Sequence, residues 1–178
     1  MPRLHVVKPE EATGSVKEIY GEVTKRMGKV VNIFQGMANS PAGLRAYLAM
    51  SAALSDGELP PQDREAVYLA VSESNGCHYC VSAHSILGKR AGMTDQSVLA
   101  ARLFQSTDTR QQALLAFVRK VIDTKGYVTD GELAAVRDSG YSDGQIVEAI
   151  GYIALATFSN FFNHVHDTQI DFPPAPVL

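Results

Sequence analysis

Apolar residues recur at helical spacing along nearly the whole chain, and this pattern is the strongest restriction on its fold. One stripe occupies positions i, i+3, i+4, i+7 and i+11: Val16, Ile19, Tyr20, Val23 and Met27. Such a stripe is typical of an amphipathic helix. No segment shows the convincing apolar–polar alternation of a half-buried strand. We therefore expect an all-α protein of about seven or eight helices.

Helix start and stop signals divide the chain into these helices. Ser40-Pro41 predicts an N-cap followed by a proline in the first helical turn, and Pro60-Pro61 predicts another start. Asn75-Gly76 predicts a break, because both residues accept positive φ, and Gly92 is suited to end the following helix. Two later starts have the form of a capping box: Thr129-x-x-Glu132 and Ser142-x-x-Gln145. The proline-rich tail FPPAPVL cannot be helical.

Two segments are too apolar to be solvent-facing helices. AVYLAV, residues 66–71, is apolar on all sides and predicts a buried helix. IVEAIGYIALATF, residues 146–158, carries Glu148 and is shorter than the roughly 20 residues of a membrane span. We interpret it as a buried core helix and expect no membrane association.

The composition is that of one ordinary globular domain, which we assign to residues 1–178. Apolar residues make up 46% of the chain, charged residues 20%, and the formal net charge is −3. Nothing here favours nucleic acid as a partner, since no run of Lys and Arg is present. The N-terminal residues lack the apolar stretch of a secretory signal, so we expect a cytoplasmic protein.

Both cysteines of the chain lie in one Cys-x-x-Cys, within NGCHYCVSAH. On a helix, Cys77, Cys80 and His84 would fall at i, i+3 and i+7, on one face. The helix start and a neighbouring imidazole both favour the thiolate, which is the reactive form of cysteine. Because a structural disulfide is rare in a reducing compartment, the pair indicates redox chemistry or metal binding.

Two alternatives to a redox pair stay open at this level. Two cysteines on a helix can be inert packing residues. They can also be half of a zinc site, whose other ligands would have to be His84, or His164 and His166 of NHVHD. His164 and His166 are two residues apart and would point to different sides of a helix, which makes them a poor pair of ligands.

A fourth residue extends the motif. Glu65 lies twelve residues before Cys77, which gives E-x(11)-C-x-x-C-x(3)-H. With its flanks, REAVYLAVSESNGCHYCVSAH, this spacing resembles the signature of the alkyl hydroperoxidase D-like group in the carboxymuconolactone decarboxylase superfamily. The resemblance implies an alkyl hydroperoxidase D-like helical domain with its core motif at about residues 61–92, in the peroxidase-related branch.

The resemblance also implies roles for the four residues. Cys80 would attack a peroxide, and Cys77 would then condense with it to a disulfide that an external dithiol reduces. Glu65 and His84 would form a proton relay, and no cofactor or metal is implied. Helix-dipole reasoning alone would make Cys77 the more acidic thiol, because it lies nearer the helix start. Which cysteine attacks is therefore open.

Two positions need a separate comment. In the best-characterised members of the group a histidine directly precedes the second cysteine, where this chain has Tyr79. We expect Tyr79 to have a supporting role at most, because a phenol is a poor base at neutral pH. Glu65 has an alternative interpretation as an exposed first-turn residue that pairs with Arg64, Lys89 or Arg90.

The function that the sequence favours is a thiol-dependent antioxidant peroxidase acting on hydrogen or organic peroxides, with a small-molecule peroxide and an external dithiol as its partners. The alternatives are a lactone decarboxylase that uses Glu65 and His84, and a redox-sensing or metal-binding module. The apolar helix and the proline-rich tail exceed what one small domain needs to bury, and the resemblance implies association through such helices. We expect a homo-oligomer, with a trimer or hexamer favoured.

Overall fold

A computed structural model describes all residues 1–178, and it contains helices and no strands. The prediction of an all-α fold is confirmed, with nine α-helices, of which eight are longer than six residues, and one 3-10 turn. Their bounds are η1 (Pro9–Glu11), α1 (Gly14–Met27), α2 (Asn32–Met37), α3 (Pro41–Ser55), α4 (Pro61–Ser74), α5 (His78–Arg90), α6 (Asp95–Arg102), α7 (Thr109–Thr124), α8 (Asp130–Asp138) and α9 (Asp143–His166).

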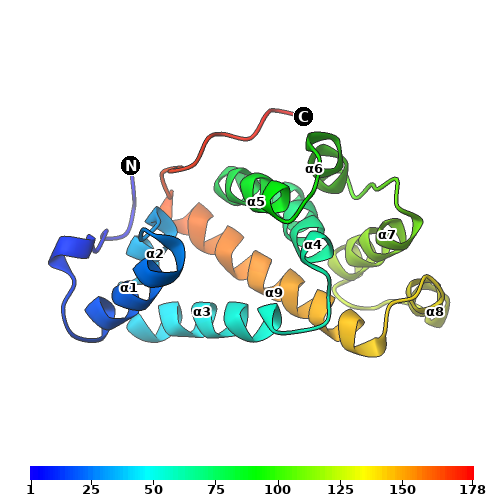
Figure 1. The fold of residues 1–178 in the computed structure, drawn as a ribbon, viewed down its shortest axis with the longest axis horizontal. Coiled ribbons are helices and arrows are strands. Elements are labelled where there is room, and N and C mark those ends of the chain that lie inside the picture. Colours follow the sequence, from blue (N-terminus) through cyan, green and yellow to red (C-terminus); the bar gives the residue numbers. More distant parts are fainter.

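Helix α9 is the long axis of the fold. It crosses the molecule diagonally, with α3 along one side and α4 and α5 on the other (Figure 1). It is 24 residues long, begins at the predicted Ser142 cap and continues through the apolar segment and SNFFNHVH. By length and composition alone it could cross a membrane, with a mean hydropathy of 1.2 over 18 residues. It nevertheless contacts α2, α3, α4, α5 and α7, as a core helix does.

Helix α4 is the second central element. It contacts α5, α6, α7 and α9. Its AVYLAV segment, residues 66–71, is buried throughout, as the sequence predicts. Burial on all sides explains why this helix shows no clear polar face. It also holds the residue directly before this segment, Glu65, close to the neighbouring helices.

Local signals set the helix ends as predicted. The Ser40 side chain accepts a hydrogen bond from Gly43 N–H, and both predicted capping boxes, at Thr129 and Ser142, are formed. Gly76 has φ of +69°, which lets the chain reverse tightly between α4 and α5. This reversal brings α4 and α5 side by side. The six-residue helix α2 is too short to show an apolar repeat and was not predicted.

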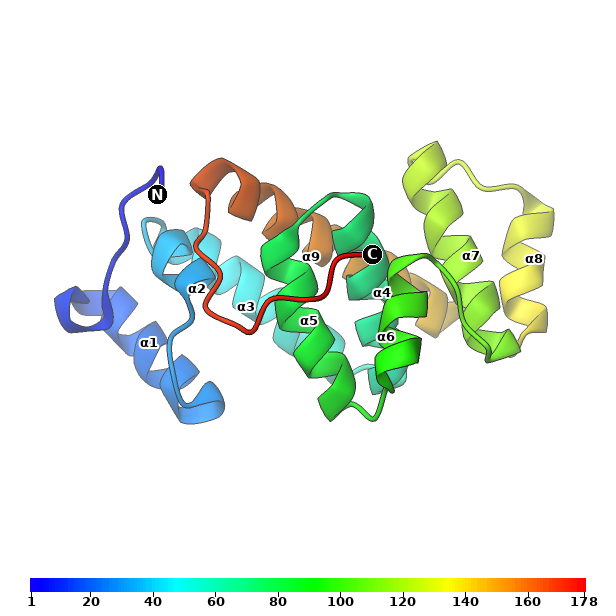
Figure 2. The same ribbon diagram turned by 90° about the horizontal axis from the view of Figure 1, so that it is seen from above.

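The C-terminal tail is non-helical and lies across α5 (Figure 2). Ala175 N–H donates to Ser82 Oγ at 3.1 Å, and the Arg102 guanidinium donates to the carbonyl of Pro176 at 2.8 Å. Arg102 is itself buried and paired with Glu73. The tail is thus attached to α5 and α6 at defined points, and it closes one side of the region that contains the two cysteines.

Candidate active site

The two cysteines lie at the start of α5, facing each other. Cys77 is the N-cap residue, and its sulfur accepts a hydrogen bond from Cys80 N–H. The Cys77 thiol donates to Cys80 Sγ, and the two sulfurs are 2.6 Å apart. Both side chains are buried. The helical spacing in the motif therefore does place the two sulfurs within reach of one another.

The surroundings make the two thiols unequal. The hydrogen bond from Cys77 lowers the pKa of Cys80 to about 6 although burial opposes this, and His84 and the amides of Asn160 and Asn163 lower it further. The pKa of Cys77 is raised, because its proton is held in the bond to Cys80 and the thiol is buried. Cys80 is thus the more acidic thiol, the reverse of what distance to the helix start alone indicates.

Glu65 and His84 form a pair next to the cysteines. His84 Nδ1 and Glu65 Oε2 are 2.7 Å apart, and their side chains are 11% and 16% exposed. The His84 ring stacks on Tyr68, with centroids 3.9 Å apart and planes at 14°. These contacts fix the plane and the direction of the imidazole. The alternative interpretation of Glu65, as an exposed partner of Arg64, Lys89 or Arg90, is wrong.

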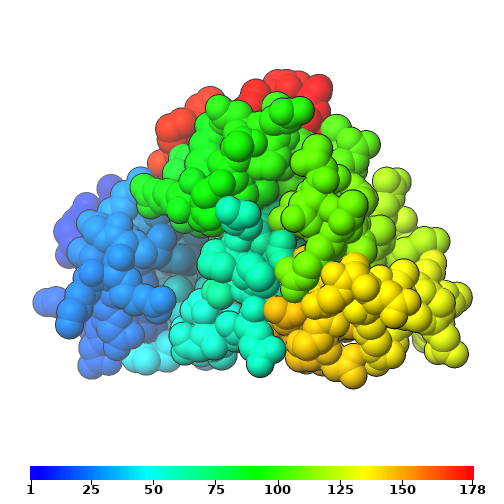
Figure 3. Space-filling model, turned by 45° about the vertical axis from the view of Figure 1, so that its right-hand side comes forward, coloured from blue at the N-terminus to red at the C-terminus, as the bar shows by residue number.

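A cavity of about 390 Å³ opens beside these residues. Cys80, His84 and Glu65 line it, and Cys77 does not. Its walls are largely apolar and include five aromatic residues: Phe34, Tyr47, Tyr68, Tyr79 and Phe172. In the space-filling view the surface is hollowed between the N-terminal helices, in blue, and the helices at the centre (Figure 3). A small molecule in this cavity would meet Cys80 first.

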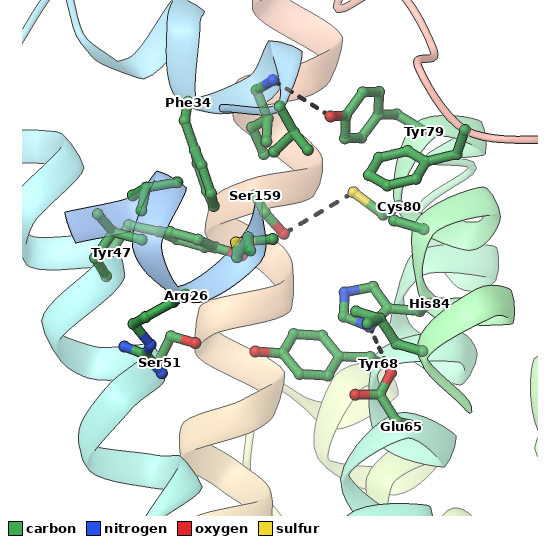
Figure 4. Close-up of a pocket in the computed structure, with 18 of the residues that line it drawn as sticks. Arg26, Phe34, Tyr47, Ser51, Glu65, Tyr68, Tyr79, Cys80, His84 and Ser159 are labelled. Atoms are coloured by element: carbon green, nitrogen blue, oxygen red, sulfur yellow. Dashed lines mark hydrogen bonds and ion pairs between the residues drawn. The ribbon is translucent and has the colours of Figure 1, made fainter. Parts of the chain in front are cut away.

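The close-up shows how the lining residues lie. Cys80, His84 and Ser159 point toward a common space, and Glu65 lies behind His84 as seen from Cys80 (Figure 4). The Cys80 thiol lies 3.9 Å from Ser159 Oγ. The imidazole therefore lies between the Glu65 carboxylate and the Cys80 sulfur, an arrangement that suits a proton relay.

Helix α9 supplies three side chains that sequence reasoning missed: Ser159, Asn160 and Asn163. Asn163 Nδ2 donates to Cys80 Sγ at 3.1 Å and lies 3.8 Å from Cys77 Sγ. Asn160 donates to Ser72 Oγ at 3.1 Å. The sequence did contain a signal for them, because these polar residues continue the buried stripe of an apolar helix. Polar residues on such a stripe need partners inside the protein.

Tyr79 has a different role from the histidine it replaces. Its hydroxyl donates to Asp171 Oδ1 at 2.8 Å and accepts from Ile33 N–H at 3.3 Å. Burial raises its pKa further above the usual value, with Asp171 adding to the effect. The Tyr79 hydroxyl thus joins the tail to α2, and it is no base at neutral pH.

His164 and His166 lie on different sides of α9. His164 is exposed, whereas His166 is buried and its Nδ1 accepts from Leu4 N–H at 3.3 Å. No group of three His, Cys, Asp or Glu side chains is placed to hold a metal ion. The geometry therefore gives no support to a zinc site built from the two cysteines and these histidines.

Comparison with known proteins shows a family similarity for part of the chain and a shared fold for most of it. The Carboxymuconolactone decarboxylase family matches residues 41–121. An alkyl hydroperoxide reductase of Mycobacterium tuberculosis is 32% identical over 90 residues, which are 50% of this chain and only 26% of that enzyme. The matched half of this chain therefore corresponds to about a quarter of that relative.

Solved structures extend the similarity to nearly the whole chain. A peroxidase-related protein from Ralstonia eutropha with an alkylhydroperoxidase AhpD core is 26% identical, covers 96% of this chain and 92% of its own, and has a TM-score of 0.86. The debrominase Bmp8 is 21% identical over 95% of this chain and 92% of its own, with a TM-score of 0.78, which shows a shared fold. The family resemblance carried by Glu65, Cys77, Cys80 and His84 is confirmed.

Proposed function

We propose that this chain of the carboxymuconolactone decarboxylase superfamily is a thiol-dependent peroxidase that reduces hydrogen or organic peroxides. The observation that carries the proposal is the position of Cys80. It is the more acidic thiol, it lines the cavity, and it has a partner thiol behind it and a Glu65–His84 pair beside it. A low-pKa cysteine next to a resolving cysteine is the arrangement expected of a redox-active thiol.

In the first step the Cys80 thiolate attacks the terminal oxygen of a peroxide. A sulfur–oxygen bond forms, the oxygen–oxygen bond breaks, and Cys80 becomes a sulfenic acid. The departing alkoxide or hydroxide takes a proton from His84, which Glu65 holds in place and whose positive charge it stabilises. The peroxide is reduced by two electrons to an alcohol or water, and Cys80 is oxidised by two.

In the second step Cys77 attacks the Cys80 sulfur. A disulfide forms and the sulfur–oxygen bond breaks, and the hydroxyl leaves as water with the proton of Cys77. The short distance between the two sulfurs, 2.6 Å in the reduced protein, supports this condensation. An external dithiol then restores both thiols by thiol–disulfide exchange and is itself oxidised to a disulfide.

The comparisons support the coarser assignment, a peroxidase-related antioxidant role. The mycobacterial relative is named an alkyl hydroperoxide reductase, and the Ralstonia protein is described as peroxidase-related. The presence of Cys80 at the cavity, with Cys77 next to it, favours redox chemistry over a lactone decarboxylase that needs only Glu65 and His84.

The experiment is peroxide consumption by the purified protein with dithiothreitol as reductant. Activity should be lost in both Cys77→Ser and Cys80→Ser. In Cys77→Ser, one equivalent of cumene hydroperoxide followed by dimedone should label Cys80 as a sulfenic acid, located by peptide mass. Ser85→Ala, a buried α5 residue away from the cavity lining, is the matched control. Full turnover without either thiol would exclude the proposal and favour acid–base chemistry by Glu65 and His84.

We also propose that the chain forms a homo-oligomer through the outer face of α9. This face carries large apolar side chains that are between 43% and 68% exposed: Val147, Ile150, Phe158, Phe161 and Val165. A continuous exposed apolar face of this kind is typical of an interaction surface. We expect a second copy of the same chain to bind this face. The face lacks charged side chains, and two identical apolar faces can bury each other.

A further inference from the structure

The amide of Asn163 lies beside both sulfurs. Its side chain is buried, and Nδ2 is 3.1 Å from Cys80 Sγ and 3.8 Å from Cys77 Sγ. Neither the sequence motif nor the Glu65–His84 pair involves this residue, which comes from the far end of another helix. Asn163 is therefore an amide donor directed at the two atoms that react.

The other half of the same amide has no partner. Asn163 Oδ1 is buried and accepts no hydrogen bond. A buried acceptor without a partner costs free energy, so it needs an explanation. Because Oδ1 shares its carbon with Nδ2, it lies close to the sulfurs. A hydroxyl formed on Cys80 would supply the donor that this oxygen lacks.

We propose that Asn163 is a further catalytic residue, which binds the sulfur of Cys80 through Nδ2 in the thiolate and accepts from the hydroxyl through Oδ1 in the sulfenic acid. This inference rests on the peroxidase function proposed above. A thiolate is a hydrogen-bond acceptor, and a buried thiolate is costly unless donors surround it. After oxygen transfer the same atom carries a hydroxyl, which is a donor.

Asn163 differs from the other donor to Cys80 in one essential respect. Cys77 donates to Cys80 Sγ in the reduced protein, but it must lose its proton to attack the sulfenic acid. An amide keeps its N–H groups throughout. As negative charge develops on Cys77 during the second step, Asn163 Nδ2 is again the nearby donor, 3.8 Å away. One amide can thus serve both sulfurs in turn.

The test measures thiol acidity without a peroxide. In a Cys77→Ser background Cys80 is the one thiol left, and its alkylation by iodoacetamide across pH 4–9 reports its pKa. Asn163→Leu removes the donor and should raise this pKa. Asn163→Asp also places a negative charge beside the sulfur and should raise the pKa more. At a pH below both pKa values, alkylation should slow about tenfold for each unit of increase, because only the thiolate reacts. At pH 9 the rates should converge.

Thr168→Val is the matched control. Thr168 follows the end of α9, is buried, has an unpartnered Oγ1, and donates its N–H to the carbonyl of Asn163. This variant should leave the alkylation profile unchanged. If Asn163→Leu does not fold, Asn163→Ala, which is smaller and uncharged, still tests the donor. An unchanged profile in a folded Asn163 variant would overturn the donor role.

The acceptor role has its own measurement, in the same Cys77→Ser background. One equivalent of peroxide forms the sulfenic acid, and a second equivalent then oxidises it to the sulfinic acid. Asn163→Leu should lose the sulfenic acid in this second reaction faster than Asn163→Asp, which keeps an oxygen at this position. Equal lifetimes would overturn the acceptor role. If no sulfenic acid forms even with Asn163 in place, the peroxidase proposal fails, whereas a shifted alkylation profile would still support the donor role.

Discussion

The two halves of α9 bury opposite kinds of side chain. In the first half the buried residues are mostly apolar, and they join the largest core cluster: Ile146, Ala149, Tyr152, Ile153, Leu155 and Ala156. In the second half they are polar: Ser159, Asn160, Asn163 and His166. The outer face carries exposed Val147 and Ile150 in the first half, and Phe158, Phe161 and Val165 in the second.

The first half of α9 therefore contributes mainly to stability, and the second half contributes mainly to the site around the cysteines. Burial of apolar surface stabilises the fold, and the first half provides it. Burial of amides and a hydroxyl is unfavourable unless each finds a partner, and in the second half Asn163 finds sulfur atoms. A helix that was selected for stability alone would continue its apolar stripe. Substitutions in the two halves should therefore affect different properties.

The largest effect is expected next to the polar half, at His84. His84→Asn removes the relay to Glu65 and should slow the reaction with peroxide by about 10²–10⁴-fold. The free energy of unfolding should change much less than the activation free energy of the peroxide reaction, since His84 is at the cavity wall. Stopped-flow peroxide kinetics and urea unfolding measure the two quantities. A rate within a few fold of that of the unsubstituted protein would exclude His84 from proton transfer.

The apolar half should respond in the opposite way. Leu155 is fully buried in the core cluster, and Leu155→Ala should lower the free energy of unfolding by about 2–5 kcal/mol through lost burial and the cavity left behind. The protein that remains folded should keep the alkylation rate of Cys80. A changed thiol pKa together with unchanged stability would contradict the division between the two halves.

The pH profile tests the polar surroundings of the sulfur directly. The pKa of Cys80 is lowered from 9.0 to about 6, so the thiolate predominates above pH 6. The rate of alkylation or of peroxide reaction should rise about tenfold per unit up to pH 6 and then level off. Cys80→Ser provides the background rate. A profile that keeps rising to pH 9 would show that the neighbours of Cys80 do not stabilise its thiolate.

Substitutions on the outer face of α9 should have the smallest effect on the site. Phe161 is 56% exposed, and Phe161→Glu should reduce the assembly to a monomer by placing a charge in the proposed interface. Light scattering at micromolar concentration measures the mass, with Lys17→Glu on α1 as the surface control. A monomeric mass for the unsubstituted protein would exclude the homo-oligomer.

Much of the local structure could be predicted from the sequence. The starts at Ser40, Thr129 and Ser142 depend on side chains that bond to backbone groups three residues away, so neighbouring residues suffice to define them. The spacing of Cys77 and Cys80 likewise depends only on helical geometry. The short helix α2 escaped prediction because six residues are too few for a repeat to be recognised.

The relative acidity of the two cysteines could not be predicted. Position in α5 alone favours Cys77, and the pKa of Cys80 is lowered instead by groups from its surroundings, Cys77, His84 and the α9 amides. The direction of Tyr79 is a second example. Its hydroxyl bonds to Asp171 and Ile33, residues 92 and 46 positions away along the chain.

The sequence by itself determined where the helices begin, which residue types carry the chemistry, and that two thiols share one helical turn. The tertiary structure decided which thiol lines a cavity, and it added the amides of α9 to the Cys77 hydrogen bond that lowers the pKa of Cys80, because both depend on how α4, α5 and α9 cross. A hydrogen bond acts over about 3 Å, whereas the residues that meet at Cys80 come from segments up to 83 residues away. No local sequence pattern brings these residues together at Cys80. The packing of the buried helix faces brings them together.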